Sequence, residues 1–196
     1  MNHVLEVGVG SGVVLASALQ LGAVKAMGID IEQAAIDVTQ VLLDKEGLGT
    51  KAQLACGDMW SVEALRGEKF DLIISNLPQF ACELVPGDNH LPSWSAGGPD
   101  GRRLIDSFLR GLPAHLRQAG RAVMTHNVFL DLIKTQALLA GDGLRARVVQ
   151  SVSVPLPLEK LQCINAGVLE RDNGRGIHRV GDNWFVDFDV LEITWQ

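Results

Sequence analysis

Apolar runs and helical periodicities alternate along most of the chain. Short, mainly apolar runs predict seven strands, at about 3–7, 24–31, 52–55, 70–75, 121–126, 145–154 and 185–194. Apolar residues at helical spacing predict helices at about 13–21, 32–46, 62–65, 104–119 and 129–140. The helix at 104–119 contains Gly111 and Pro113, so we expect it to be broken there. Residues 80–101 form a long loop, a feature that is usually functional or disordered.

This alternation predicts an α/β fold, a doubly wound and mostly parallel sheet with helices on both faces. Residues 155–170 are expected to be partly helical, and residues 173–183 are expected to form turns. Because no clear crossover helix separates the last two strands, the final strand is expected to be antiparallel. No repeat and no composition boundary divides the sequence, so we expect one domain over residues 1–196.

Composition narrows the classes of function. The 196 residues are 47% hydrophobic and 20% charged, an ordinary balance for a globular protein. The net charge of -6 argues against tight non-specific binding of nucleic acid, although a pocket for a single base stays open. No apolar run reaches membrane length and no secretory signal is recognisable. Three scattered cysteines without metal-ligand spacing predict a cytoplasmic protein that holds no metal.

The first predicted strand feeds a glycine loop that opens a helix. Gly8, Gly10 and Gly12 alternate with Val9 and Ser11 before that helix begins. Glycines permit a tight turn and a close approach by a ligand, and the helix start favours an anionic group. The sequence therefore predicts a nucleotide-type binding loop, with close packing of loop and helix as the alternative.

Polar residues stand in or after four successive predicted strands: Glu6, Asp30, Asp58 and Asn76. The carboxyl ends of parallel strands are where doubly wound sheets bind ligands. Asp30 follows Gly12 at the distance of a carboxylate that accepts hydrogen bonds from a ribose diol. A dehydrogenase that binds NAD is one interpretation, but the third glycine comes one residue earlier than in that fingerprint.

The segments 5–12, 28–30 and 57–58 resemble successive motifs of class I S-adenosylmethionine-dependent methyltransferases. The resemblance implies a seven-stranded sheet with an antiparallel last strand, and S-adenosyl-L-methionine as cofactor. It also implies that the glycine loop meets the methionine part, that Glu6 orients that end, and that Asp30 binds the ribose. Asp58 would meet the adenine amino group. The implied cofactor residues are Glu6, Gly8, Gly10, Ser11, Gly12, Asp30, Ile31, Asp58, Met59 (or Trp60 against the ring) and Asn76.

The segment 75–79 resembles the Asn-Pro-Pro-Tyr motif of methyltransferases that modify a planar NH₂ group. The resemblance implies that Asn76 offers its side-chain oxygen and Leu77 its carbonyl, while Pro78 restricts the conformation of Leu77. Gln79 stands where the family has a substrate-stacking aromatic residue, and Phe80 is a candidate replacement. The alternative is an ordinary turn with Asn76 as its cap.

The segment 94–101, followed by Leu104 and Ile105, resembles a segment of HemK-like glutamine methyltransferases, which modify release factors. The sequence therefore indicates a methyltransferase for a protein glutamine, with a translation factor among the candidate substrates. A nucleobase methyltransferase for RNA or DNA and a non-catalytic cofactor-binding scaffold are the alternatives. The substrate-recognition region that this family carries before its first strand is expected to be lacking here. No feature of the sequence indicates the oligomeric state.

Four further positions have candidate roles. His90 and Trp94 lie in the long loop and are candidates, with Gln79 and Phe80, for lining a substrate pocket. Arg102 and its neighbour Arg103 are expected to form part of a solvated face, with contact to an acidic partner as the alternative.

Overall fold

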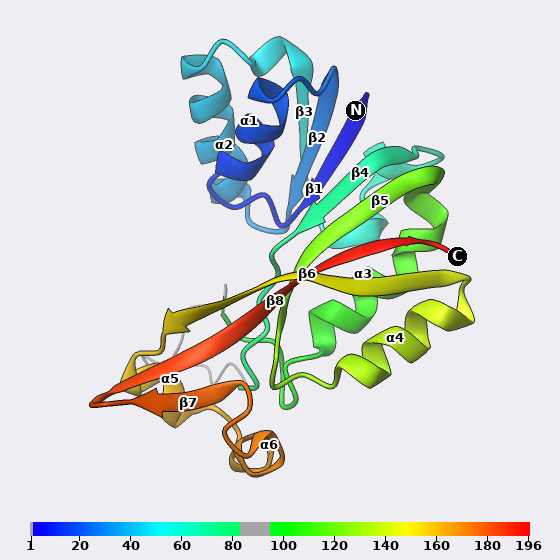
Figure 1. Ribbon diagram of the computed structural model, residues 1–196. Helices are drawn as coiled ribbons and strands as arrows, with labels where there is room; N and C mark the ends of the chain where they lie inside the picture. Colours follow the sequence, from blue (N-terminus) through cyan, green and yellow to red (C-terminus); the bar gives the residue numbers. More distant parts are fainter. Residues whose placement is uncertain (1, 83–94) are drawn as a thin grey trace. The chain divides into compact units, whose positions relative to one another are not determined.

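The computed structural model of the protein describes residues 2–82 and 95–196 (Figure 1). Its elements up to residue 76 are β1 (His3–Val7), α1 (Val13–Gln20), β2 (Lys25–Asp30), α2 (Gln33–Lys45), η1 (Gly49–Lys51), β3 (Ala52–Cys56), η2 (Met59–Ser61), η3 (Glu63–Leu65) and β4 (Phe70–Ser75). Those after residue 95 are α3 (Arg103–His115), β5 (Leu116–Asn127), α4 (Leu132–Gly141), β6 (Leu144–Pro155), α5 (Leu158–Cys163), α6 (Ala166–Asp172), β7 (Ile177–Val180) and β8 (Asn183–Trp195).

The strands hydrogen-bond in the order β3-β2-β1-β4-β5-β8-β6, and β7 pairs with β8. Neighbouring strands from β3 to β5 run parallel, and the C-terminal strands are antiparallel. The strand order reverses at β1, which pairs with β2 on one side and β4 on the other. The predicted doubly wound, mostly parallel sheet is therefore confirmed, and β7 adds an eighth strand to the seven predicted.

The chain divides into two compact units. The first comprises Met1–Asn76, Gly111–Met124 and Ile193–Gln196, and the second comprises Leu77–Arg110 and Thr125–Glu192. That residues 1–196 act as a single domain stays a prediction. No helix among the described residues is both long enough and apolar enough to span a membrane.

The first unit is built around β1, all five of whose residues are buried. Such a strand reads as a continuous apolar run because helices cover both faces of a parallel sheet. Leu15 and Leu19 of α1 pack with Ile36 and Leu43 of α2 in the core beside β1. In the second unit a separate apolar cluster joins residues of α5, α6, β7 and β8.

The α3 helix continues through Gly111 and Pro113 to His115, so the prediction of a broken helix reaching residue 119 was wrong. Pro113 stands two residues before the end of the helix, so it affects only the last turn. Gly111 is required by packing, because a Cβ there would lie 2.2 Å from Nε1 of Trp60. The ring of Trp60 also stacks on His115, with centroids 4.9 Å apart.

A second difference lies in residues 173–183, which were predicted to form turns. Within them β7 pairs antiparallel with β8, with Ile177 opposite Val186 and Val180 opposite Asn183. The two residues between, Gly181 and Asp182, close a hairpin. A Gly-Asp pair between two strand-forming runs is a hairpin signal, but β7 is too short for its alternation to stand out.

Candidate functional site

The glycine loop follows β1 and turns the chain into α1. Gly8, Gly10 and Gly12 have φ angles of 76°, 54° and 77°, a region that residues with side chains rarely adopt. The backbone N–H of Gly8 donates to the carbonyl of Ile29 at 2.9 Å, which ties the loop to the end of β2. The turn thus depends on its glycines for its backbone conformation.

The loop also packs on α2, through a residue that was not predicted from the sequence. A Cβ on Gly12 would lie 2.7 Å from Cγ2 of Thr39. The buried hydroxyl of Thr39 donates to the carbonyl of Gly10 at 3.2 Å. Thr39 lies between Ile36 and Leu43 on the buried face of α2. In the sequence, a polar residue at an apolar position of the predicted helix was the signal that could have identified Thr39.

The start of α1 leaves backbone donors open. Gly12 is its N-cap, and no side chain forms a cap hydrogen bond there. Gly10 and Ser11 are exposed just before it. Uncapped N–H groups at the positive end of a helix dipole suit a carboxylate or another anionic group.

Asp30 ends β2, and its carboxylate lies against the loop. One oxygen accepts the N–H of Gly10 at 2.9 Å, and the other accepts the N–H of Glu32 at 3.0 Å. The side chain is half-buried, so its remaining lone pairs can accept further hydrogen bonds. The next residue, Ile31, is 65% exposed. A carboxylate beside an exposed apolar side chain suits a ribose diol that carries a planar ring.

Glu6 lies within β1 and is 5% exposed. Its Oε2 has no hydrogen-bond partner among the described residues. The pKa of Glu6 is raised to about 8, mainly because the carboxyl is buried and also because of the charge of Asp30, while a hydrogen bond from the backbone N–H of Leu15 opposes the rise. A cationic group bound there would give the oxygen a partner and favour the ionised carboxylate.

The turn after β3 presents Asp58 and Met59. Asp58 is exposed, and Met59 has a φ of 42°, a conformation that costs free energy for a residue with a side chain. Such strain is often found in ligand-binding turns. Trp60 is held instead by its stacking on His115. Of the two side chains predicted to lie against a planar ring, Met59 is therefore the better candidate.

Asn76 is the first residue after β4, and it is exposed. Ser75 pairs with Val7 in the sheet, and its hydroxyl donates to the carbonyl of Val7 at 3.0 Å. Gly8 follows Val7, so Asn76 and the glycine loop leave neighbouring strands at the same level. The side chain predicted to bind the methyl acceptor thus stands next to the loop predicted to bind the cofactor.

Within the second unit, the chain after Asn76 turns inward. Leu77 is buried, Pro78 is half-buried and Gln79 is 2% exposed. Nε2 of Gln79 donates to the carbonyl and hydroxyl oxygens of Thr125 at 3.0 and 2.9 Å, and its Oε1 accepts the N–H of Asn127 at 2.8 Å. Gln79 was predicted to contact the substrate, but its carboxamide forms hydrogen bonds inside the fold. These hydrogen bonds connect the segment 75–79 to β5.

Phe80 also makes internal contacts. Its ring centroid lies 6.3 Å from that of Phe129, and Nζ of Lys160 lies 5.3 Å from it on the ring face. These contacts hold the ring in the packing of the second unit. His90 and Trp94, also predicted to line the substrate pocket, lie outside the described residues.

The glycine-rich segment after the loop packs on the motif itself. The N–H of Gly97 donates to the carbonyl of Phe80 at 2.8 Å. A Cβ on Gly97 would lie 2.9 Å from Cα of Gln79, and one on Gly101 would lie 2.4 Å from the carbonyl oxygen of Gln79. These glycines therefore let one stretch of backbone lie directly against another, and they hold the turn at 77–80.

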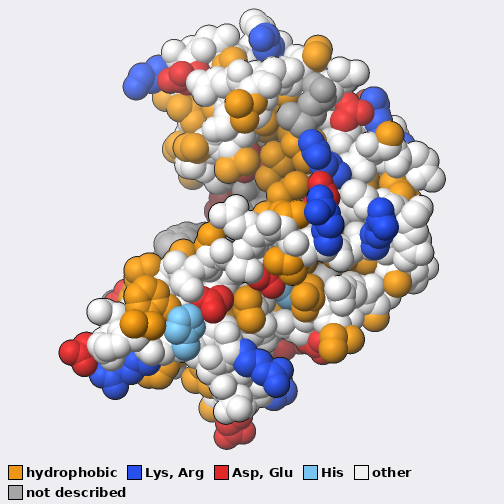
Figure 2. Space-filling model, in the orientation of Figure 1, with side chains coloured by type: hydrophobic (Ala, Val, Ile, Leu, Met, Phe, Trp, Pro, Cys, Tyr) orange, Lys and Arg blue, Asp and Glu red, His pale blue; other side chains and the backbone are white. Residues whose placement is uncertain are grey.

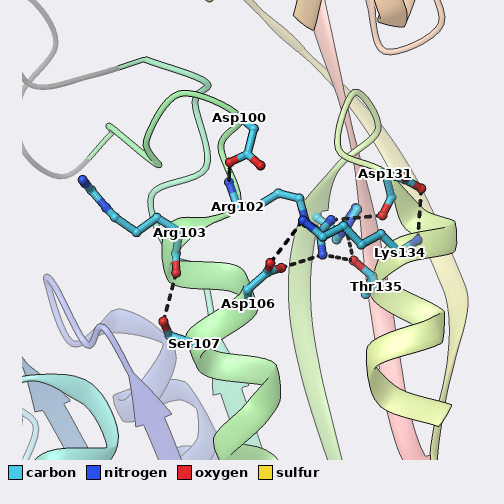
Figure 3. A network of polar contacts seen from close by, with 9 residues as sticks. Asp100, Arg102, Arg103, Asp106, Ser107, Asp131, Lys134 and Thr135 are labelled. Atoms are coloured by element: carbon cyan, nitrogen blue, oxygen red, sulfur yellow. Dashed lines mark hydrogen bonds and ion pairs between the residues drawn. The ribbon is translucent and has the colours of Figure 1, made fainter. Parts of the chain in front are cut away.

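The side chain of Arg102, which follows this segment, lies in a network of polar contacts (Figure 3). Its guanidinium is 4% exposed and lies 2.7 Å from Oδ1 of Asp106, while it donates to the carbonyl of Asp131 and the hydroxyl of Thr135, each at 3.0 Å. The prediction that Arg102 belongs to a solvated face was wrong, because these acceptors satisfy its charge inside the fold. Arg103 is exposed, as predicted.

His126 extends this network from the end of β5. It is fully buried, and its Nε2 lies 2.9 Å from the hydroxyl of Thr135. Burial and the charge of Arg102 lower the pKa of His126 to about 4. The imidazole is therefore neutral at physiological pH and serves as a hydrogen-bonding part of the interior.

Residues 4–86 match a family described as a methyltransferase domain. A protein of *Methanocaldococcus jannaschii* named as a candidate protein N5-glutamine methyltransferase is 28% identical over 166 residues, which are 84% of this chain and 81% of that protein. The release factor glutamine methyltransferase of *Xylella fastidiosa* is 36% identical over 131 residues, 64% of this chain. The match covers 46% of that enzyme, so the chain spans about half the length of the release-factor relative.

Solved structures show the same fold. A ribosomal protein L11 methylase from *Lactobacillus delbrueckii* subsp. *bulgaricus* matches with a TM-score of 0.59 and 18% identity, over 99% of this chain and 70% of that one. The YcgJ protein of *Bacillus subtilis* matches with a TM-score of 0.67 and 14% identity, over 99% and 92%. The domain match over residues 4–86 and the methyltransferase relatives, together with this fold, support a class I S-adenosylmethionine-dependent methyltransferase.

Proposed function

We propose that the chain methylates a planar amino nitrogen, with the side-chain amide of a protein glutamine as the first candidate acceptor. The observation that carries the proposal is the position of Asn76. The pairing of Ser75 with Val7 brings Asn76 out of the sheet beside Gly8 and its loop. An acceptor held by Asn76 would therefore lie next to a cofactor held by the loop.

The groups of the first unit fit S-adenosylmethionine. The unpartnered oxygen of Glu6 suits the ammonium group, and the exposed backbone of Ser11 at the positive end of α1 suits the carboxylate. Asp30 would accept the ribose hydroxyls, while Asp58 would meet the adenine amino group, with exposed Ile31 beside the ring. The cofactor supplies a methyl group already activated by a sulfonium.

The protein's part in the reaction is to position the nitrogen. The side-chain oxygen of Asn76 and the carbonyl of Leu77 would accept its two N–H bonds, and Pro78 confines Leu77 to an extended backbone. Both acceptors draw charge toward the nitrogen and direct its lone pair, which is a preorganised electrostatic effect. Asn76 and Leu77 would hold the nitrogen in place while it receives the methyl group from the cofactor's sulfur, and the proton that the nitrogen loses would pass to water.

A small amide suits this motif better than a nucleobase. A base needs a stacking surface, but Gln79 is buried and bonded, and Phe80 is held by Phe129 and Lys160. On the face seen in Figure 2, basic side chains are interspersed with acidic ones, and no continuous basic surface covers it. Phosphate backbones require such a surface.

The relatives support a protein acceptor, since one is named a release factor glutamine methyltransferase. A translation factor is therefore the first candidate partner, which would place the reaction in the cytoplasm. The alternative acceptors are a base of RNA or DNA, and the alternative function is a scaffold that binds the cofactor without turnover.

The test is transfer of a labelled methyl group from S-adenosylmethionine into a cell extract. The native chain is compared with Asn76→Ala and with Asn2→Ala, a matched change at an exposed asparagine outside the motif. We expect label that resists nuclease, is lost with protease, and is recovered as N5-methylglutamine after digestion. Asn76→Ala should reduce it at least a hundredfold, the order of loss when a positioned polar group is removed, while Asn2→Ala leaves it unchanged.

Each other result has a defined meaning. Label that is lost with nuclease would replace glutamine by a base. Label that Asn76→Ala leaves intact would remove Asn76 from the reaction. Cofactor binding by calorimetry without any label would overturn the transferase activity of this chain and favour the scaffold.

A further inference from the structure

The β6 strand lies at one end of the strand order and has β8 as its neighbour on one side. It has 12 residues, about twice the usual length of a strand, and residues 147–155 are all exposed. The strand at the other end of the order, β3, has 5 residues, and its Ala52 and Leu54 pack on the core of the first unit. Among the described residues, β6 is thus the long and uncovered edge of the sheet.

The contacts between β6 and β8 show which backbone groups of β6 point outward. The N–H of Leu156 donates to the carbonyl of Trp184 at 2.8 Å, so the backbone of Leu156 faces β8. Two side-chain hydrogen bonds keep the same antiparallel register: Ser151 with Asp189 and Ser153 with Asp187. Because the direction of the backbone groups alternates along a strand, the odd-numbered residues within 147–153 face outward. Their N–H and C=O groups form an edge on which another strand can pair.

The side chains along this edge are apolar and exposed. Four valines are between 37% and 46% exposed: Val148, Val149, Val152 and Val154. They lie on both faces of the strand, since Val149 alternates with the other three. Residues 148–154 contain neither a charge nor a proline, the features that usually protect an edge strand from pairing. A strand placed beside β6 would therefore cover apolar surface on both faces.

The charges beside this edge are divided along its length. The beginning of β6 carries Arg145 and Arg147. Beside its second half, β8 carries Asp187 and Asp189, which accept hydrogen bonds from the two serines of β6. A second β6 strand running parallel would bring the arginines of both copies together, whereas an antiparallel one brings the arginines of each copy toward the aspartates of the other. The charge pattern thus fits a second copy of this chain, related by a twofold axis.

We infer that the chain forms a symmetric dimer in which two β6 strands pair antiparallel, with the twofold axis at Gln150. In this register Val148 of each copy lies opposite Val152 of the other, so that apolar side chains meet across the axis. An interface of this kind uses the same surface on both copies, the commonest arrangement in homo-oligomers. The inference goes beyond the proposed methyl transfer and does not depend on it.

The direction of the backbone groups sets the geometry at the axis. Val149 of one copy and Ser151 of the other form a hydrogen-bonded pair, so the two copies of Gln150 form a pair without backbone hydrogen bonds. The Cα atoms of such a pair are about 4.5 Å apart, which lies within the range that a disulfide spans. A cysteine at position 150 therefore reports this register.

The cross-linking test compares Gln150→Cys with Gln136→Cys, a matched change at an exposed glutamine of α4. Both carry Cys56→Ser, which removes the exposed native thiol. With oxidised glutathione as the acceptor of the two electrons and two protons, Gln150→Cys should give a disulfide-linked dimer on a non-reducing gel, and Gln136→Cys should not. Equal cross-linking of the two variants, or none in Gln150→Cys, would overturn the pairing.

Analytical ultracentrifugation between about 1 and about 500 μM measures the association itself. We expect a reversible equilibrium between monomer and dimer in the native chain. Val152→Lys should raise Kd about tenfold or more, because a lysine on an edge strand opposes pairing. Ile133→Lys, at a residue of α4 that is 78% exposed, should leave Kd unchanged.

Circular dichroism verifies that both lysine variants are folded, and the cross-linking test requires neither of them. A native chain that stays monomeric over the whole concentration range would overturn the inference. A dimer that Val152→Lys and Ile133→Lys affect equally would place the contact elsewhere on the surface and would overturn it as well.

Discussion

The helices of the two units begin in different ways. In the first unit, α1 and α2 start at Gly12 and Glu32, and neither N-cap residue forms a side-chain cap hydrogen bond, although Glu6 accepts the backbone N–H of Leu15 in the first turn of α1. In the second unit, Asp131 caps α4 by accepting the N–H of Lys134 and Asn165 caps α6, whereas α5 has no side-chain cap. An uncapped start is less stable, but it keeps backbone donors available for a ligand.

Polar side chains follow the same division. Asp58 and Asn76 of the first unit are exposed at strand ends. Gln79, Arg102 and His126 of the second unit are buried, and each forms hydrogen bonds with other residues of that unit. Asp58 and Asn76 thus stand at the surface of the first unit, whereas Gln79, Arg102 and His126 hold the interior of the second.

Replacing Glu6 by Gln should change the pH dependence of stability most strongly. The pKa of Glu6 is raised from 4.5 to about 8 in the folded chain, so folding favours the protonated form. The contribution of Glu6 is fully present below pH 4.5 and is lost as the pH rises to about 8. At 1.36 kcal/mol for each pH unit, the loss amounts to about 5 kcal/mol. Urea denaturation from pH 4.5 to 8.5 measures it.

The quantity compared between the native chain and Glu6→Gln is the slope of unfolding free energy against pH, because other groups titrate in the same range. The unfolding free energy of Glu6→Gln should fall less with rising pH than that of the native chain, by the full amount of about 5 kcal/mol, since Gln carries no titratable proton. Equal slopes in the native chain and the variant would show that Glu6 is already ionised in the folded protein. The buried, unpartnered Oε2 would then need a cation other than a bound ligand.

Arg102→Met should be the next most damaging change, at about 3 kcal/mol of unfolding free energy. It removes the buried guanidinium from Asp106 and Thr135, which keep only half-exposed Lys134 at 3.4 Å and the imidazole of His126 at 2.9 Å, respectively. The matched change Arg103→Met alters an exposed side chain and should stay within about 0.5 kcal/mol. Equal effects in urea denaturation would contradict the buried network.

Arg102 and Arg103 also show where sequence reasoning stops. Two adjacent arginines before a helix look alike in sequence, and only one of them meets Asp106, Asp131 and Thr135 in the fold. Two of these partners are about 30 residues away, and no local pattern indicates them. The strands and the glycine loop were predictable because apolar runs and glycine spacing are local signals.

The acceptor end was harder to predict for the same reason. The sequence placed Asn76 correctly after β4, because the apolar run 70–75 ends there. It could not show that Gln79 turns inward, because that depends on Thr125 and Asn127, more than 40 residues later. The position of β6 at the end of the strand order is likewise visible only once the whole fold is known.

Gly111→Ala tests packing within the first unit and should cost about 2 kcal/mol. The added methyl would lie 2.2 Å from Nε1 of Trp60, so the indole that stacks on His115 must move. Gly141→Ala is the control, since nothing lies within 4 Å of a methyl at that helix position. The control should be neutral or slightly stabilising, because alanine restricts the unfolded chain. The midpoints of thermal unfolding of both variants measure this difference in stability.

Asp131→Ala should have the smallest effect, about 1 kcal/mol, because it removes the side-chain acceptor of the α4 cap. The backbone carbonyl that accepts from Arg102 remains, so the buried network should persist and methyl transfer should stay unchanged. Asp131→Asn keeps an acceptor and should recover most of the loss in urea denaturation. If both variants lose equally, the charge of Asp131 near Lys134 matters more than its cap hydrogen bond. The caps of the second unit would then be electrostatic, and the contrast with α1 and α2 would lie in charge rather than in unsatisfied donors.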